Sequence, residues 1–411
     1  MKSVQTLELF NNCLSGSIPA QVGSLTALQN SFSLDSNRFT GVVPSTISYL
    51  TQLTALVLST NSISQLPQEL SSMTTLVSLS VDDNALTAGL PSTLGDMTWL
   101  LFLNASANSL TEFPSFLGDM VGLQTLLVSE NNFAGQIPDV FGSLQALKNL
   151  ALVGNSLTGD LPNSLYALTK LSFLGIGSND FTGTISSTLG EFPLLEVLGI
   201  ADNLFTGAIP TALCEIRVLS QLSVQNNFLS NTIPTCLGNL TTMEHLYLDN
   251  NRITGSIPAN FDGLVNMASL NINNNELTGA LPAELGSLVN LQALYASSNL
   301  LTGTISDGIG SAYNLTAFVV NDNFIEGTLP TILATLSRLS LIQMNDNLLT
   351  GALPVLNTLP LLETLLLYNN NLSGGLADAF SINQTQLNLI DVANNNFNGK
   401  IPGALFELPN L

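Results

Sequence analysis

The chain repeats one short pattern of hydrophobic and polar positions, Leu-x-Leu-x-x-Asn, along almost its whole length. In a clear copy, Leu246 and Leu248 flank Tyr247, and this period of two predicts a short strand. The two leucines are expected to enter the core while the tyrosine faces outward. Asn251 ends the strand, and Gly255 follows at a turn that a side chain would hinder. Each copy therefore predicts one strand followed by one tight turn.

The asparagine of the pattern occupies 17 positions that lie 23 to 25 residues apart. Repetition with this period predicts a solenoid, in which each repeat packs only on its neighbours. A buried asparagine at the end of each strand can bond backbone groups of adjacent turns, so we expect a structural role rather than a catalytic or metal-binding array. These anchor asparagines are Asn12, Asn37, Asn61, Asn84, Asn108, Asn131, Asn155, Asn179, Asn203, Asn227, Asn251, Asn275, Asn299, Asn323, Asn347, Asn370 and Asn395.

Glycine stands four residues after the anchor in 13 repeats, and proline stands seven residues after it in 12. The turns after Asn61 and Asn108 lack this glycine and are one residue shorter. In one further repeat Asn231 replaces the glycine, and asparagine is the next best residue for a positive φ. These departures predict local irregularities, not a break in the solenoid.

The full pattern, Leu-x-x-Leu-x-x-Leu-x-Leu-x-x-Asn-x-Leu-Thr-Gly-x-Ile-Pro, resembles the plant-type leucine-rich repeat, and residues 240–258 and 264–282 match it closely. That family includes receptor-like kinases, receptor-like proteins and polygalacturonase inhibitors. The resemblance implies an α/β repeat solenoid: a curved right-handed superhelix with a parallel β-sheet on its concave face and mostly loop and 3-10 structure on its convex side. We treat residues 1–411 as a single domain of 17 anchored repeats and a partial eighteenth.

Both ends of the chain lie inside the repeat pattern, and the cysteine-paired caps usual in the family are not recognised. We therefore expect a piece of a longer protein, with any signal peptide, transmembrane helix or kinase domain outside it. The resemblance implies an extracellular or cell-surface location and a glycoprotein that takes part in signalling.

Composition narrows the range of partners. The chain carries 8 Lys and Arg against 29 Asp and Glu, a net charge of −21. Such a surface repels nucleic acids and anionic membranes, and it favours a basic partner. Solubility alone is the alternative explanation. No apolar run is long enough to span a membrane, so we expect no direct membrane contact from this segment.

The residues needed for catalysis or metal binding are scarce. The chain has one histidine, His245, and three cysteines, and it lacks nucleotide-binding and kinase motifs. We therefore predict no enzyme, no metal and no cofactor. Cys214 and Cys236 lie in adjacent repeats, where either a disulfide or two free thiols fit the sequence, and Cys13 has no evident mate.

Aligning the repeats predicts which side chains line the concave face. Two tyrosines stand among polar residues on three adjacent strands, a composition that suits a peptide or glycan ligand. An ordinary pair of exposed tyrosines is the alternative. The candidate ligand-binding residues are Tyr247, Tyr295, His245, Asp249, Asn271 and Asn273.

Acidic residues stand just before many of the anchors. They favour a peptide with basic groups, although a solvated edge explains them equally well. These residues are Asp82, Asp83, Glu130, Asp202, Asp249, Asp322 and Asp346.

Five Asn-x-Ser/Thr sequences are candidate N-glycosylation sites if the chain is secreted. A glycan on the first of them would cover part of the concave face and move binding toward the C-terminal half. The candidates are Asn104, Asn239, Asn314, Asn371 and Asn383.

We predict that the chain recognises a protein or peptide ligand through the concave or lateral face of a receptor-type ectodomain, with a co-receptor as a further partner. One alternative is a secreted inhibitor of a cell-wall-degrading enzyme. Another is ice binding, because threonine recurs three residues after the anchor, although it also belongs to the repeat pattern of the family. These threonines include Thr158, Thr182, Thr206, Thr254, Thr278 and Thr302.

Overall fold

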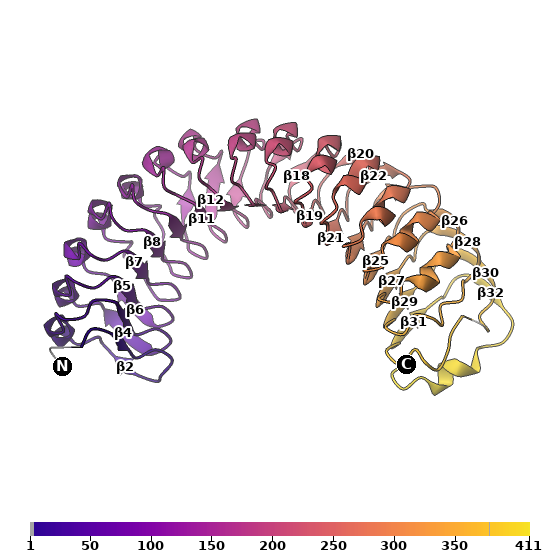
Figure 1. The fold of residues 1–411 in the computed structure, drawn as a ribbon, viewed down its shortest axis with the longest axis horizontal. Helices are drawn as coiled ribbons and strands as arrows, with labels where there is room; N and C mark the ends of the chain where they lie inside the picture. Colours follow the sequence, from indigo (N-terminus) through magenta and orange to yellow (C-terminus); the bar gives the residue numbers. More distant parts are fainter. Residues whose placement is uncertain (1–3, 378) are drawn as a thin grey trace. The chain divides into compact units, whose positions relative to one another are not determined.

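The structure is a computed structural model that describes residues 4–377 and 379–411. Contacts divide the chain into two compact units: residues 1–183 with 191–204, and residues 184–190 with 205–411. Each unit is a stack of repeats. Within each unit, short parallel strands line one side of the stack and 3-10 helices line the opposite side (Figure 1).

Each of the 17 repeats contributes one strand of two or three residues, ending four residues before its anchor. In the first unit these strands are β1 (Leu7–Glu8), β3 (Ser31–Ser33), β5 (Ala55–Val57), β7 (Ser78–Ser80), β8 (Phe102–Asn104), β9 (Thr125–Leu127), β11 (Asn149–Ala151), β13 (Phe173–Gly175) and β15 (Val197–Gly199). In the second unit they are β17 (Gln221–Ser223), β19 (His245–Tyr247), β21 (Ser269–Asn271), β23 (Ala293–Tyr295), β25 (Ala317–Val319), β27 (Leu341–Gln343), β29 (Thr364–Leu366) and β31 (Leu389–Asp391).

A second set of short parallel strands follows the anchors. In the first unit they are β2 (Ser15–Gly16), β4 (Arg38–Val42), β6 (Ser62–Gln65), β10 (Ala134–Gly135), β12 (Ser156–Gly159) and β14 (Asp180–Phe181). In the second unit they are β16 (Thr206–Gly207), β18 (Phe228–Leu229), β20 (Thr254–Ser256), β22 (Glu276–Gly279), β24 (Leu300–Leu301), β26 (Glu326–Thr328), β28 (Leu348–Ala352), β30 (Asn371–Gly375) and β32 (Asn396–Asn398).

The opposite side of most repeats is a short 3-10 helix, most often entered through the proline of the pattern. These helices are η1 (Ala20–Ser24), η2 (Ser45–Tyr49), η3 (Gln68–Ser72), η4 (Ser92–Asp96), η5 (Ser115–Asp119), η6 (Phe141–Ser143), η7 (Asn163–Ala167), η8 (Ser187–Glu191), η9 (Thr211–Glu215), η10 (Thr235–Asn239), η11 (Ala259–Gly263), η12 (Ala283–Ser287), η13 (Asp307–Ser311), η14 (Thr331–Thr335) and η15 (Gly403–Glu407). The predicted fold class, a leucine-rich-repeat solenoid with a parallel sheet and 3-10 structure opposite, is confirmed. The described residues contain no α-helix, and none of their helices is long and apolar enough to cross a membrane.

The core of each unit is filled from both sides by the leucines that the pattern predicts to be buried. Leu246 pairs in register with Leu270, which pairs with Leu294, and all three are fully buried. Leu237 and Leu285 enter the same core from the 3-10 side and are also fully buried. Because each strand carries its apolar residue at the same place, stacking the repeats buries a continuous apolar column.

The anchor asparagines join consecutive turns through hydrogen bonds, as predicted. Asn299 is buried, and its Nδ2 donates to the carbonyl oxygen of Ile272 in the preceding repeat at 2.9 Å. The same nitrogen donates to the Ser297 carbonyl at 3.0 Å, while Oδ1 accepts from the amide of Leu277 at 3.0 Å. One side chain therefore satisfies backbone groups in its own repeat and in the one before it.

The residue directly before each anchor adopts a positive φ, which the sequence pattern did not reveal. Asn274, Asp322 and Asp346 lie at φ values of 50°, 54° and 55°. This left-handed conformation favours Asn, Asp and Gly, so it explains why small polar residues gather there. Asn231, which replaces the turn glycine, also has a positive φ of 65°, as expected.

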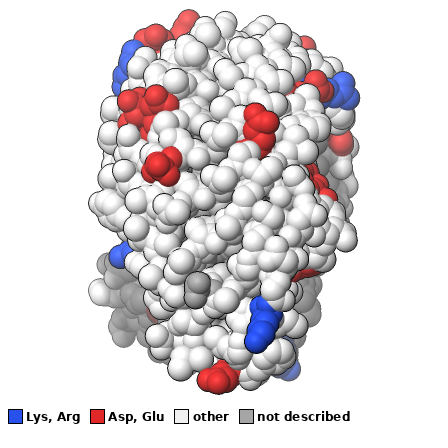
Figure 2. Space-filling view, turned by 90° about the vertical axis from the view of Figure 1, so that its right-hand side faces the viewer, with Lys and Arg blue, Asp and Glu red and all other residues white. Residues whose placement is uncertain are grey.

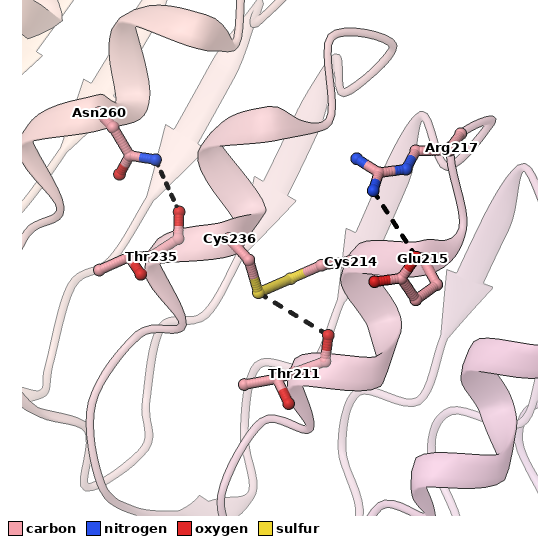
Figure 3. The surroundings of a disulfide bond; sticks show 7 residues. All are labelled: Thr211, Cys214, Glu215, Arg217, Thr235, Cys236 and Asn260. Carbon is pink, nitrogen blue, oxygen red and sulfur yellow. Dashed lines mark hydrogen bonds and ion pairs between the residues drawn. A yellow bond between two sulfur atoms is a disulfide. The ribbon is translucent and has the colours of Figure 1, made fainter.

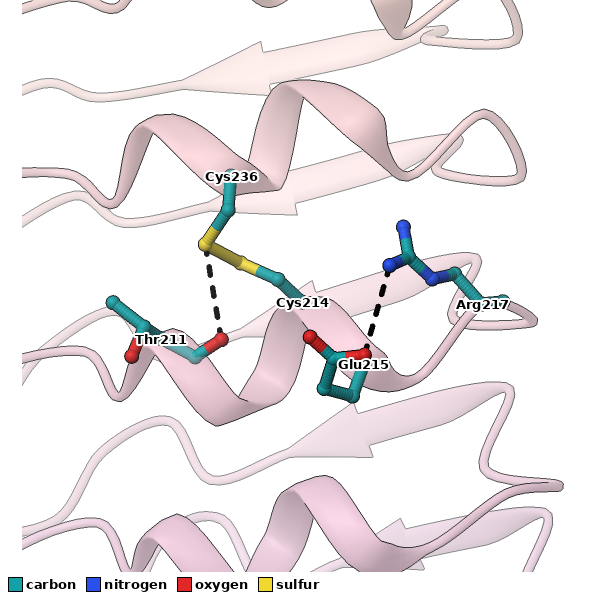
Figure 4. A network of polar contacts seen from close by, with 5 residues as sticks. All are labelled: Thr211, Cys214, Glu215, Arg217 and Cys236. Atoms are coloured by element: carbon teal, nitrogen blue, oxygen red, sulfur yellow. Dashed lines mark hydrogen bonds and ion pairs between the residues drawn. A yellow bond between two sulfur atoms is a disulfide. The ribbon is translucent and has the colours of Figure 1, made fainter.

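Cys214 and Cys236 form a disulfide, which decides between the two alternatives that the sequence left open. Their sulfur atoms are 2.07 Å apart and their Cα atoms 5.8 Å apart. The bond joins η9 to η10 on the 3-10 side of the second unit (Figures 3 and 4). Cys236 Sγ also lies 3.7 Å from the Thr211 carbonyl oxygen, and Cys13 is a free, exposed cysteine.

Replacing Asn299 by Ala should lower the free energy of unfolding by about 2–4 kcal/mol, because the buried Leu277 amide loses its acceptor and the carbonyl oxygens of Ile272 and Ser297 each lose one of two donors. The matched control is Asn290→Ala, since exposed Asn290 makes one hydrogen bond, to the Val265 carbonyl. The control should cost about 1 kcal/mol or less. Urea unfolding monitored by circular dichroism measures both, and equal losses would contradict the structural role of the anchor.

Removing the disulfide with Cys214→Ser plus Cys236→Ser should lower the free energy of unfolding by roughly 3 kcal/mol, because the bond closes a segment of 22 residues. Cys13→Ser is the control and should leave the unfolding midpoint unchanged. If reduction of the wild-type chain left its urea midpoint where it was, the bond would not contribute to stability.

Candidate functional site

The six predicted ligand-binding residues lie on or just after β19, β21 and β23 of the second unit. Tyr247 pairs in register with Asn271, and Asn271 pairs with Tyr295, so these three side chains form one row across the strands. Two strand spacings separate the tyrosines, which is about 10 Å. We use the name strand face for a set of outward positions in the second unit. These positions lie two, four and six residues before each anchor.

His245 and Tyr247 form a pair at one end of this row. Their rings are stacked with centroids 5.9 Å apart and planes inclined by 13°. The Tyr247 hydroxyl lies 3.3 Å from His245 Nδ1, and the histidine tautomer decides which of the two groups donates. Both side chains are half-buried, so the pair presents a wide and partly fixed aromatic surface.

The two asparagines of the site are oriented by backbone groups. Asn271 Oδ1 accepts from the amide of Asn273 at 3.2 Å, and Asn273 Oδ1 accepts from the amide of Ser297 at 2.6 Å. In the described part of the chain, neither Nδ2 group makes a hydrogen bond. Because the oxygens are engaged, both side chains offer N–H donors to a ligand.

Asp249 lies beside this row, two residues after Tyr247 and two residues before the anchor Asn251. Its Oδ2 accepts from Asn250 Nδ2 at 2.7 Å, and Asn250 Oδ1 accepts in turn from Asn274 Nδ2 at 2.8 Å. These bonds continue the polar edge of the site from one repeat to the next.

Strand β25, which pairs with β23, contributes a shallow apolar surface next to Tyr295. Ala317 and Val319 on β25 occupy outward positions of the strand but are buried. Val319 pairs in register with Tyr295, so the tyrosine ring stands at the border of a shallow apolar surface. The arrangement can hold an extended ligand by ring packing and by hydrogen bonds to its acceptors.

The acidic residues predicted before the anchors are partly explained by the backbone. Asp83, Glu130, Asp202, Asp322 and Asp346 all occupy the positive-φ position. Asp82 and Asp249 stand one residue earlier, and Asp82 accepts from Ser59 Oγ at 2.6 Å. Most of the face drawn in Figure 2 is uncharged, and its acidic groups are small and scattered.

One group that the sequence analysis did not single out is Tyr368, two residues after β29. Partial burial and the negative charges of Asp346, Asp322 and Asp391 raise the pKa of this phenol. The signal was present in the sequence, because Tyr368 stands two residues before its anchor. Tyr247 and Tyr295, the tyrosines named from the sequence, stand four residues before their anchors instead.

The five candidate glycosylation sites differ in access. Asn239, Asn371 and Asn383 are exposed, whereas Asn104 is half-buried on β8 of the parallel sheet. Asn314 is half-buried, and its Nδ2, the atom that would carry a glycan, donates to the Val289 carbonyl at 2.7 Å. All five stay predictions.

The threonines behind the ice-binding alternative lie on or beside the second set of strands. Thr254 pairs with Glu276, and Thr278 pairs with Leu300, so threonine does not pair with threonine there. Ice binding stays a prediction. The described residues hold no group of three or more His, Cys, Asp or Glu side chains arranged to bind a metal ion.

Comparison by sequence identifies the repeat family. A profile described as leucine-rich repeat region matches residues 164–398, and leucine-rich-repeat profiles match residues 30–86 and 122–144. Comparison with curated proteins found no match.

Comparison of structures finds plant receptors. The plant peptide hormone receptor RGFR1, in complex with RGF2, is 27% identical with a TM-score of 0.84 over 100% of this chain and 74% of that chain. PEPR1, in the crystal structure of PEPR1–AtPEP1, is 30% identical with a TM-score of 0.87 over 100% of this chain and 61% of that one. The Arabidopsis receptor kinase HAESA, in complex with the peptide hormone IDA and the co-receptor SERK1, is 30% identical with a TM-score of 0.83 over 98% of this chain and 72% of that one. The chain therefore spans less than two thirds of the PEPR1 chain and somewhat more of the other two.

Proposed function

Because this chain belongs to the leucine-rich-repeat family, we propose that it recognises an extended peptide through the strand face of its second unit. The peptide contacts Tyr247, Asn271 and Tyr295, and His245, Asp249 and Asn273 border the contact. The chain acts as the ligand-binding part of an extracellular or cell-surface receptor.

The observation that carries this proposal is the row of two aromatic rings with oriented amide donors between and beside them. Tyrosine offers a large apolar surface with a polar tip and few torsions to immobilise, so it anchors peptides well. The Nδ2 groups of Asn271 and Asn273 can donate to peptide carbonyl oxygens. The tyrosines are about 10 Å apart, a distance that about three residues of extended peptide span.

The structural neighbours support a peptide as the ligand class. RGFR1 is described as a plant peptide hormone receptor in complex with RGF2, and HAESA is described in complex with a peptide hormone and a co-receptor. We extend both features to this chain: a peptide on the strand face, and a co-receptor as a second protein partner.

The disulfide supports an extracellular location. Disulfides persist in secreted and cell-surface proteins, and they are rare in the reducing cytosol. The Cys214–Cys236 bond and the three exposed glycosylation sequences fit the same compartment.

The charge of the strand face favours a basic peptide. The chain has a net charge of −21, and no Lys or Arg occupies any of the six positions before an anchor in the second unit. A basic segment would therefore approach this face without meeting a like charge there.

The tyrosines can be tested with a peptide selected from a random displayed library on the immobilised wild-type chain. Tyr247→Ala plus Tyr295→Ala should weaken its binding at least about 30-fold, because aromatic anchors dominate such interfaces. Isothermal titration calorimetry measures the affinity.

Tyr49→Ala plus Tyr313→Ala is the matched control, because both tyrosines are exposed and lie outside the strand face. The control should bind like the wild type. Undiminished affinity of the Tyr247 and Tyr295 variant, or equal weakening of both variants, would refute the proposed site. Measuring inhibition of a polygalacturonase by the chain separates this function from the enzyme-inhibitor alternative.

A further inference from the structure

A second group of polar side chains gathers on the last strands of the second unit. Asp322 and Asp346 precede the anchors of consecutive repeats, and Tyr368 and Asp391 come from the next two. Their strands are consecutive neighbours, because β25 pairs with β27, β27 with β29, and β29 with β31. The three carboxylates contribute to the raised pKa of the Tyr368 phenol. We name Asp322, Asn345, Asp346, Tyr368 and Asp391 the acidic cluster.

Hydrogen bonds orient all three of these carboxylates, and Asp391 Oδ1 accepts from the amide of Ala393 at 3.0 Å. Asp346 Oδ2 accepts from Asn345 Nδ2 at 2.7 Å, and Asp346 Oδ1 accepts from Asn369 Nδ2 at 2.6 Å. Asp322 Oδ2 accepts from Asn321 Nδ2 at 2.6 Å. All of these donors are neutral, so they position the carboxylates and leave their charge uncompensated.

No cation balances the cluster within the described residues, where the one ion pair is between Arg217 and Glu215 on the other side of the repeats. Partial burial and three negative charges raise the pKa of Tyr368, and the same negative charges would attract a cation.

A buried acceptor without a partner lies in the same place. Asn345 is only 1% exposed, and its Oδ1 has no hydrogen bond although its Nδ2 is held on Asp346. An orphaned buried oxygen is costly, and such groups in folded proteins usually find a donor. A cation with several N–H donors could bind Asp346 in place of Asn345 Nδ2. The Asn345 amide could then turn, and its Oδ1 could accept a hydrogen bond from the cation.

Backbone geometry does not account for the charge. The φ values of 54° at Asp322 and 55° at Asp346 favour Asn as much as Asp, and Asn occupies the equivalent position at Asn250 and Asn274. Asp391 lies on a regular strand, and its Oδ1 accepts from the amide of Ala393 in the following turn. The charges of Asp322 and Asp346 therefore point to a role other than holding the turn.

We propose that the acidic cluster is a subsite for an arginine side chain of the peptide ligand. This inference rests on the proposed function and locates one end of the peptide. A guanidinium is planar and has five N–H donors, so it can bridge carboxylates on adjacent strands and pack on the ring of Tyr368. β29 lies three strand spacings beyond β23, which is about 14 Å or four to five residues of extended peptide from Tyr295.

The test uses fluorescence anisotropy with a labelled tetraarginine peptide and a tetracitrulline peptide of equal length, in which the charge is absent. The wild-type chain should bind tetraarginine and not tetracitrulline. Asp322→Asn plus Asp346→Asn should weaken tetraarginine binding at least about tenfold, because charge-assisted hydrogen bonds are lost. Asn tolerates the positive φ at both positions, so this variant should fold.

The matched control is Asp262→Asn plus Asp307→Asn, which removes two exposed charges on η11 and η13 of the same unit. It should change tetraarginine binding less than about twofold, since separated exposed charges are screened. Equal weakening of both variants would mean that only net charge attracts the probe. That result would overturn the inference, as would equal binding of the two peptides or no binding of tetraarginine.

Two further results separate this inference from the proposed function. If Tyr247→Ala plus Tyr295→Ala abolished binding of the library-selected peptide while Asp322→Asn plus Asp346→Asn left it intact, the subsite would be wrong and the peptide-binding function would stand. If tetraarginine bound at the acidic cluster but no library peptide were retained, the subsite would stand without the proposed function.

Discussion

The side-chain amide of the anchor asparagine holds each turn of the chain to the next, and the rest of the structure depends on this interaction. At Asn299 the nitrogen donates to carbonyl groups in two successive repeats, and the oxygen accepts from Leu277 after the previous anchor. Loss of one anchor leaves a buried backbone group, such as the Leu277 amide, without its acceptor, and such an orphaned group is costly. With the anchors and the inward leucines holding the stack, the outward side chains of the strands have no comparable structural duty and can differ from repeat to repeat.

Much of the fold was predictable, because the pattern of apolar and polar residues in each repeat specifies its strand and turn. The alternation of Leu246, Tyr247 and Leu248 predicts a strand with one exposed face, and the structure places these residues as expected. Aligning the repeats also predicted that Tyr247, Asn271 and Tyr295 would form a row, since parallel strands in register bring equivalent positions together.

Other features depend on how the repeats stack, which the pattern does not express. Whether Cys214 and Cys236 pair depends on the distance between two 3-10 turns, and the sequence left both alternatives open. The positive φ before each anchor explains why small polar residues stand there, but it does not explain why some of them are charged. The sequence pointed to Asp322 and Asp346 but not to the rest of the acidic cluster, because its members come from three different positions of the repeat. Only the stacked structure brings Asp391 and Asp322 to Tyr368.

The proposed function depends both on features that each repeat encodes and on features that arise only when the repeats stack. A rigid stack presents aromatic rings and oriented donors on one side, and an excess of negative charge selects what approaches it. The central claim is that a peptide binds the strand face of the second unit. Photo-crosslinking of a library-selected peptide that carries a benzophenone, followed by mass spectrometry of the adducts, tests this claim most directly. The account predicts adducts on β19, β21 and β23. Adducts confined to η9–η14, or to the strands that follow the anchors, would contradict it.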